Sequence, residues 1–218
     1  GFGLFEKGSA EYFEYDLNVA LLEALDFNVP PQSDYFPKPL TRGFTLYQDG
    51  FGEGIVNGSS SGNGVLDFYS QDNPQEGNYG IYWTGVGQYD AIAFDFIRDV
   101  DLSLVKDNGH ILEFFVRTNA SEAKFDVRFL DTKTDALDKP WRMGKTITGI
   151  PSDNEWHLVQ IPLVDLEEKG AWDGAWYPPN GNNFDWRSID RLKSSPNISR
   201  STGSIIGYMS RKVVRARF

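Results

Sequence analysis

The sequence of 218 residues predicts an all-β fold, a β-sandwich of the jelly-roll type, preceded by a short strand and one helix. Between residues 43 and 192, short segments alternate apolar and polar side chains, and turns rich in Gly, Asn, Asp and Ser separate them. Alternation with period two is the pattern of a strand that has one face on a core. About eight such segments with almost no helix are typical of a sandwich or jelly roll.

The alternation also indicates which side chains form the core. The clearest cases place one set of apolar residues on a single face of two segments: Ile92, Phe94, Phe96, Phe125, Val127 and Phe129. The intervening residues, such as Asp95 and Arg128, then face away from the core. The predicted strands are Phe44–Gln48, Gly64–Tyr69, Gly80–Thr84, Ala91–Ile97, Ile111–Thr118, Lys124–Leu130, Trp141–Ile147 and Glu155–Leu163.

The chain divides into four regions. Residues 1–31 hold a short apolar run and then an amphipathic helix between Tyr12 and Phe27, which Pro30 and Pro31 end. Residues 32–42 are rich in proline and predict an extended linker. Residues 43–192 form the predicted jelly roll. The strand and helix of the first region cannot bury their apolar face alone, so they need a partner.

Residues 193–218 form the fourth region and differ in charge from the rest. They contain six basic residues and no acidic one, whereas the whole chain has a formal charge of −10. Such a change of sign at one point marks a distinct segment. A basic interaction tail is one interpretation, and a change of reading frame in the underlying gene is another.

Composition excludes several classes of function. A net charge of −10 argues against nucleic acid, whose phosphates need a basic face, and against an anionic membrane surface. No apolar run approaches the length of a bilayer span. The absence of Cys excludes disulfides and thiolate sites. Aromatic residues make up 15% of the chain, more than a core of this size needs, which indicates a surface use.

No catalytic residue is predicted. The sequence contains only two histidines, His110 after a turn, where we expect it in solvent, and His157 within a predicted strand. Phosphate-binding loops, nucleophile elbows and zinc spacings are absent. Glycoside cleavage needs a pair of carboxyl groups, and no pair stands out by its setting, since Glu167 and Glu168 lie in a polar segment read as a solvated turn.

Sugar binding requires aromatic rings for the flat C–H faces of pyranoses and planar polar groups for the hydroxyls. Three segments combine them, around Tyr79, around Trp141–Arg142, and most densely from Trp172 to Trp186. This last segment has no periodic face, so we expect Trp176 and Tyr177 to be exposed. Trp172 and Trp186 either join them or pin the loop to the core.

The order of segments resembles family 11 carbohydrate-binding modules from about Leu46 to Leu192. The resemblance rests on IVNGSSSGNGVLDFYS, GNYGIYWTG, AIAFDF, DNEWHLVQIPLVDL, WYPPNG and SIDRL, in that order. It implies a jelly roll that holds a single β-1,4 or mixed-linked β-1,3-1,4 glucan chain in a cleft, together with structural calcium. After Leu192 the sequence departs from the family pattern.

The same resemblance implies positions for the carbohydrate-binding residues. Trp176 stands where the family has a cleft tyrosine, and Asp190 where it has a cleft aspartate. Tyr79 falls at or beside another aromatic cleft position, and Asp138 and Arg142 border a strand that supplies a polar contact. With Tyr177, these residues form the predicted site.

Residues 1–25, GFGLFEKGSAEYFEYDLNVALLEAL, resemble the final strand and helix of a family 5 glycoside hydrolase (β/α)₈ barrel. This resemblance implies that the chain is the C-terminal part of a secreted endo-β-1,4-glucanase, a cellulase, and that the module targets the enzyme to plant cell-wall polysaccharide. Two alternatives stay open: a β-sandwich enzyme that degrades glycans with acidic residues, and a protein–protein assembly module.

Overall fold

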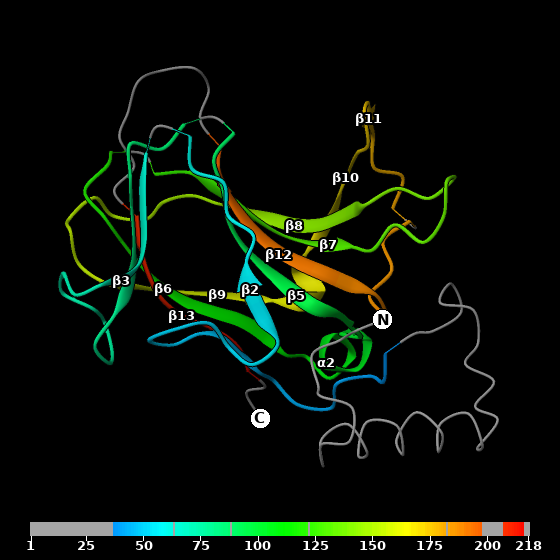
Figure 1. The fold of residues 1–218 in the computed structure, drawn as a ribbon, viewed down its shortest axis with the longest axis horizontal. Helices are drawn as coiled ribbons and strands as arrows, with labels where there is room; N and C mark the ends of the chain where they lie inside the picture. The colour runs from blue at the N-terminus through cyan, green and yellow to red at the C-terminus, as the bar shows by residue number, and fades with distance from the viewer. Residues whose placement is uncertain are drawn as a thin grey trace, which may run out of the picture. The chain divides into compact units, whose positions relative to one another are not determined.

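Two antiparallel sheets form the part of the chain that the structure describes (Figure 1). The computed structural model describes residues 37–62, 64–87, 89–121, 123–181 and 183–197, and the backbone of 207–215. The predicted barrel strand and helix of residues 1–31 lie outside the described residues. The predicted β-sandwich is confirmed at the level of an all-β, sheet-rich fold with little helix.

One sheet has six strands and the other has seven, each named here in its order across the sheet. The six-stranded sheet consists of β3 (Val65–Ser70), β4 (Gly80–Thr84), β13 (Gly207–Arg215), β6 (Ile111–Thr118) and β9 (His157–Pro162), with β1 (Thr45–Tyr47) also paired to β13. The seven-stranded sheet consists of β11 (Trp176–Tyr177), β10 (Glu167–Trp172), β8 (Trp141–Ile147), β7 (Phe125–Asp131), β12 (Ile189–Pro196), β5 (Ile92–Val100) and β2 (Ile55–Asn57). Two short helices connect strands, α2 (Ser103–Asp107) and the 3₁₀ turn η2 (Leu163–Asp165).

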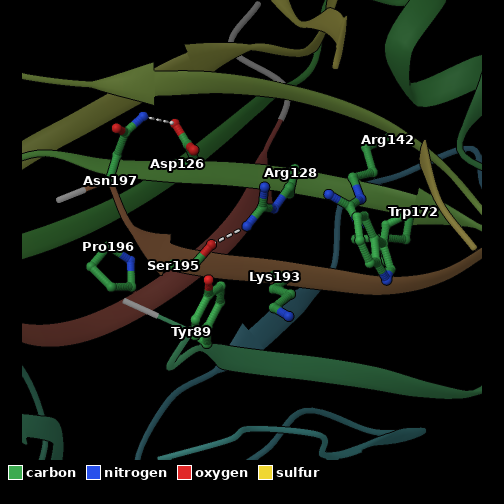
Figure 2. Close-up of a pocket in the computed structure, with 10 residues that line it drawn as sticks. Tyr89, Asp126, Arg128, Arg142, Trp172, Lys193, Ser195, Pro196 and Asn197 are labelled. Carbon is green, nitrogen blue, oxygen red and sulfur yellow. Dashed lines mark hydrogen bonds between the residues drawn. The ribbon is translucent and has the colours of Figure 1, made fainter. Parts of the chain in front are cut away.

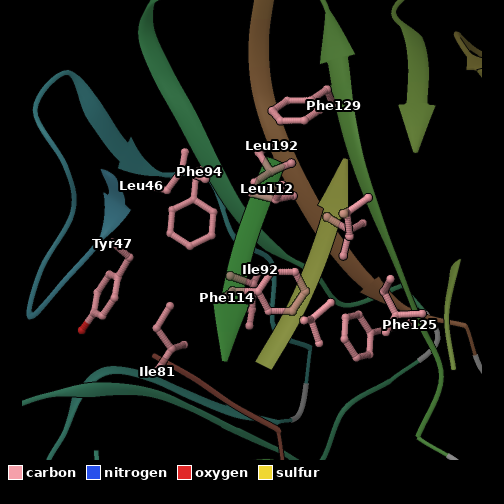
Figure 3. Close-up of a cluster of buried hydrophobic side chains, with 14 of the residues drawn as sticks. Leu46, Tyr47, Ile81, Ile92, Phe94, Leu112, Phe114, Phe125, Phe129 and Leu192 are labelled. Atoms are coloured by element: carbon pink, nitrogen blue, oxygen red, sulfur yellow. The ribbon is translucent and has the colours of Figure 1, made fainter. Parts of the chain in front are cut away.

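The core lies between the two sheets, where the alternating apolar residues of both meet (Figure 3). Phe94 of β5 and Phe129 of β7 are fully buried on one side, and Phe114 of β6 is fully buried on the other. Because successive side chains of a strand point to opposite faces, the residues between them lie on the outer faces. The predicted inward sets of Ile92–Phe96 and Phe125–Phe129 are therefore confirmed.

The eight predicted strands are all present, and three of them, β4, β6 and β8, have the predicted bounds. Five further strands were not predicted: β2, β10, β11, β12 and β13. β10 begins at Glu167, in the segment that the sequence suggested as a solvated turn. Its short pattern offers no clean alternation, and pairing with β8 holds it in the sheet.

The expected boundaries also shift. Leu192 falls inside β12, and β13 pairs with β4, β6 and β1, so the structure places parts of the expected tail within both sheets. The second half of the expected linker is docked: Pro39 forms a bridge with Asp101, and the Leu40 N–H donates to the Asp101 carbonyl at 2.9 Å.

His110 is 3% exposed, which corrects the expectation that it lies in solvent. Its backbone N–H donates to the Val105 carbonyl of α2 and its carbonyl accepts from Leu163 of η2, so the two helical turns enclose it. His157 lies on β9, where its Nε2 is 2.8 Å from an Asp153 carboxylate oxygen. Within the described ranges, no helix is long and apolar enough to cross a membrane.

Candidate functional site

The outer face of the seven-stranded sheet is hollowed into a groove of about 720 Å³ (Figure 2). Cationic and aromatic side chains dominate its lining: Arg128, Arg142, Lys193, Tyr89 and Trp172. The other lining residues are Asp126, Leu130, Ser195, Pro196 and Asn197. A smaller hollow of about 280 Å³ beside Trp176 shares three of these residues, so the two are parts of one surface.

Strands β7, β8 and β12 form the floor of the groove. In the antiparallel register Lys193 of β12 lies directly opposite Arg128 of β7, and Arg128 lies opposite Gly144 of β8. Opposite residues project from the same face. A Cβ on Gly144 would lie 2.7 Å from the Arg128 Cβ and 2.6 Å from the Val127 carbonyl oxygen, so glycine makes room for the arginine.

One wall of the groove is the hairpin of β10 and β11. Trp172 and Trp176 lie directly opposite each other in this hairpin and are 56% and 50% exposed. Gly174 turns the hairpin with a φ of +71°, a conformation that glycine adopts without strain. Gly170 leaves space for the Trp176 ring, which would lie 2.8 Å from a Cβ at that position.

Ion pairs and backbone hydrogen bonds hold the aromatic residues in place. The Asp173 carboxylate, within the hairpin turn, binds Lys133 at 2.7 Å and Lys139 at 3.0 Å and so fixes the hairpin to the preceding loop. Tyr89, on the other side of the groove, is 85% exposed. Its neighbour Asp90 is buried and accepts hydrogen bonds from two loop N–H groups, which fixes the loop that presents the tyrosine.

The charged side chains Arg128 and Asp126 of the floor form hydrogen bonds with neutral side chains. Arg128 donates to the Ser195 hydroxyl, and Asp126 accepts from the Thr146 hydroxyl at 2.6 Å and from the Asn197 amide at 3.0 Å. Figure 2 shows Arg128 and Lys193 between Tyr89 and the neighbouring side chains of Trp172 and Arg142.

Burial lowers the pKa of each cation on the floor, and neighbouring positive charges lower the pKa of two of them further. Burial, and after it the charges of Arg128, Arg142 and Arg191, lowers the pKa of Lys193. Burial, and after it the charge of Arg128, lowers the pKa of Arg142. Burial likewise lowers the pKa of Arg128, against the opposing effect of Asp126. Positive potential is therefore concentrated in the groove of a protein whose overall charge is negative.

The structure brings together three of the predicted site residues. Arg142 lines the groove, and its guanidinium lies 5.7 Å from the centre of the Trp176 ring. Trp176 lines the smaller hollow. Tyr177 follows it on β11, with the Lys139 ammonium 4.9 Å from its ring centre, although Tyr177 lines neither hollow.

The other three predicted site residues lie elsewhere. Tyr79 borders the six-stranded sheet, edge-on to Tyr69 at 5.8 Å. Asp138 closes a turn by accepting from the Thr134 hydroxyl and N–H. Asp190 lies on β12 outside the lining of either hollow, and burial raises its pKa to about 6.

Sequence reasoning missed most of the lining. Trp172 is half exposed on the groove wall, whereas Trp186 packs against the core beside Phe129, so the two tryptophans take the two roles that the sequence left open. Arg128 carried a usable signal, since it alternates with the buried Val127 and Phe129. Lys193 carried none, because its strand was not predicted.

The groove suits binding better than glycoside cleavage. Cleavage needs two carboxyl groups, and Asp126 is the single carboxylate among the described residues that line the groove. No group of three or more His, Asp or Glu side chains in the described ranges could hold a metal ion. The structural calcium implied by the resemblance stays a prediction.

The sequence of this chain matches a known family of protein domains. The chain matches the family model described as carbohydrate binding domain 30 over residues 60–206, which extends past the boundary expected at Leu192. No curated protein matches the chain.

Solved modules of two families share the fold. One is a family 30 module, with 18% identity and a TM-score of 0.58 over 81% of this chain and 89% of that one. Another is the family 30 module of the cellulosomal cellulase Cel9D-Cel44B of Clostridium thermocellum, with 18% identity and a TM-score of 0.56 over 81% and 99%. A third is the family 11 module of Clostridium thermocellum in complex with a β-1,3-1,4-mixed-linked tetrasaccharide, with 12% identity and a TM-score of 0.53 over 81% and 97%.

The comparisons refine the expectation drawn from the order of segments. The likeness to family 11 modules holds for the fold, at an identity too low to show more. The family model covers more than half of the chain, from the loop before β3 to the residue before β13. The chain belongs to the family of carbohydrate binding domain 30.

Proposed function

We propose that this chain binds β-glucan, a β-1,4 or mixed-linked β-1,3-1,4 chain, along the groove of the seven-stranded sheet without cleaving it. One observation carries the proposal: Trp172 and Trp176 stand side by side on the hairpin, both about half exposed, beside a floor of polar side chains. Half-exposed indoles offer apolar faces to pyranose rings, and Arg128, Ser195 and Asn197 offer hydrogen bonds to hydroxyls.

Two observations support a chain-like ligand. The groove and the smaller hollow share Asp126, Arg128 and Asn197, so the binding surface runs across several strands. The family 11 structure of the same fold is described as a complex with a mixed-linked tetrasaccharide. An open surface of this kind encloses few groups per sugar and must order a flexible ligand, so we expect weak binding to each chain.

The proposal includes a biological setting. We infer that the chain is the secreted, C-terminal targeting part of an endo-β-1,4-glucanase and directs its catalytic barrel to plant cell-wall polysaccharide. Linking a binding module to a catalytic domain raises the local concentration of substrate without a new contact to the catalytic site. The likeness to a module of a cellulosomal cellulase supports this setting.

Native affinity electrophoresis in gels that contain barley β-glucan tests the proposal. The chain is expected to be retarded, Trp172→Ala and Trp176→Ala less so. Tyr69→Ala is the matched control, because Tyr69 is 55% exposed but lies on the six-stranded sheet. An unretarded chain would refute glucan binding, and release of sugar from the gel would favour the alternative of a β-sandwich enzyme.

A further inference from the structure

The groove holds more positive charge than a neutral polysaccharide needs. Of the ten described residues that line it, three are cationic and one is acidic, in a chain of net charge −10. In the described part of the chain, none of Arg128, Arg142 and Lys193 forms an ion pair. Charged side chains on a sheet surface are usually interspersed with opposite charges, so this concentration calls for an explanation.

The placement of the cations costs stability. Lys193 and Arg128 lie directly opposite each other on neighbouring strands, a position in which like charges are destabilising. Both side chains are partly buried, which weakens screening by solvent. Burial, and after it the charges of the neighbouring arginines, lowers the pKa of Lys193.

The nearby acidic groups offset this charge only in part: the charge of Asp126 opposes the effect of burial on the pKa of Arg128, and the charge of Asp95 opposes it for Lys193, but neither forms an ion pair with these cations. Asp95 is engaged by Arg191 through two hydrogen bonds of 2.6 and 2.7 Å. Asp126 is held by the neutral donors of Thr146 and Asn197. The groove therefore presents unpaired positive charge next to exposed aromatic rings, and its best-matched occupant carries both sugar rings and negative charge.

We propose that the groove binds an acidic glycan, a chain whose sugars carry carboxylates or sulfate esters, with the anionic groups over Arg128, Lys193 and Arg142 and the rings against Trp172. The proposal deepens the proposed function and rests on it, because it concerns the same groove. Both anions suit the planar fork of arginine, which binds oxyanions through two parallel hydrogen bonds. Nucleic acid is less favoured, since it carries a charge on every phosphate and the net charge of −10 repels so dense a polyanion outside the groove.

The test compares four soluble polymers by isothermal titration with the full chain: barley β-glucan, the same glucan partly oxidised to the carboxylate at C6, the same glucan partly sulfated, and single-stranded DNA. Titrations run from about 0.1 M to about 1 M salt, over which the Debye length falls from about 10 Å to about 3 Å. We expect the acidic glucans to bind more tightly than the neutral one at low salt and to lose this advantage at high salt. Whichever of the oxidised and the sulfated glucan binds more tightly identifies the anion as carboxylate or sulfate.

Two variants with the same loss of charge locate the effect. Lys193→Gln is expected to weaken binding of the acidic glucan about fivefold more than it weakens binding of the neutral glucan. It is also expected to raise the melting temperature, because it removes the repulsion with Arg128. Lys38→Gln removes a charge that is exposed and outside the groove, and is expected to change neither value.

The outcomes separate this inference from the proposed function. Equal affinity for neutral and acidic glucan would overturn the inference and leave glucan binding intact. Failure to bind any glucan would overturn both. DNA bound as tightly as the acidic glucan would also overturn the inference, because binding would then depend on negative charge and not on sugar rings.

Discussion

Replacing Trp172 with alanine removes the largest apolar surface of the groove wall, and its effect on binding follows from that surface. Trp172 is 56% exposed. A tryptophan side chain presents up to about 250 Å², so about 140 Å² is open to solvent. A sugar ring stacked on one face covers about half of it, roughly 70 Å², which at about 25 cal/mol per Å² contributes about 1.8 kcal/mol. Trp172→Ala should therefore raise the Kd for barley β-glucan about 20-fold.

Isothermal titration of the parent and of Trp172→Ala measures this change, with Tyr69→Ala as the control of equal exposure on the other sheet. Melting temperatures of all three confirm that the hairpin of β10 and β11 stays folded. A Kd within about twofold of the parent, in a folded variant, would refute the stacking argument. A larger loss in Tyr69→Ala would move the site to the six-stranded sheet, beside Tyr79.

Three further substitutions test residues of the seven-stranded sheet that forms the groove. Asp131 is 2% exposed and burial raises its pKa to about 8, so between about pH 4 and pH 8 the folded protein holds a proton that the unfolded chain has released. The free energy of unfolding should fall as pH rises through this window, by at most about 1.4 kcal/mol per pH unit. In urea unfolding at pH 5, 6 and 7, Asp131→Asn should show a weaker dependence on pH than the parent. The same dependence in both proteins would contradict this. Glu168 accepts four backbone N–H groups between Asn180 and Phe184, which outweigh its burial and lower its pKa. Glu168→Ala should destabilise this loop by about 1.5 kcal/mol and speed its proteolysis at pH 7, whereas Glu168→Gln should lose less; unchanged cleavage in Glu168→Ala would contradict the role. Gly144→Ala should cost about 1–3 kcal/mol in urea unfolding and weaken glucan binding, because the new Cβ displaces Arg128; a variant as stable and as tight as the parent would contradict the packing.

The eight strands predicted from alternation share a physical basis. In β5 and β7 a row of large apolar side chains faces the core, and the period of two follows from the backbone itself. Loss of that alternation explains the strands that were missed. β10 carries Glu-Glu-Lys-Gly and is held by its pairing with β8. β12 carries Lys193, Ser194 and Ser195, and both serines are buried.

The candidate site was only partly predictable for the same reason. The dense aromatic loop pointed to Trp176 and its neighbours, and the structure does place Trp176 beside Arg142. No local pattern distinguishes Trp172, which faces the groove, from Trp186, which packs on Phe129. Exposure of a side chain depends on what lies opposite it, and the chain neighbours do not specify that.

The sequence by itself determined the class of the fold, most of its strands and the outward direction of Arg128. It also indicated carbohydrate binding and not catalysis. Those properties follow from side-chain period and composition, which are local. Only the tertiary structure decided that Lys193 lies opposite Arg128, that Gly144 makes room beside them, and that a hairpin brings Trp172 to the same face. The first two relations join residues 65 and 16 positions apart in the chain, and they depend on the register in which the strands pair.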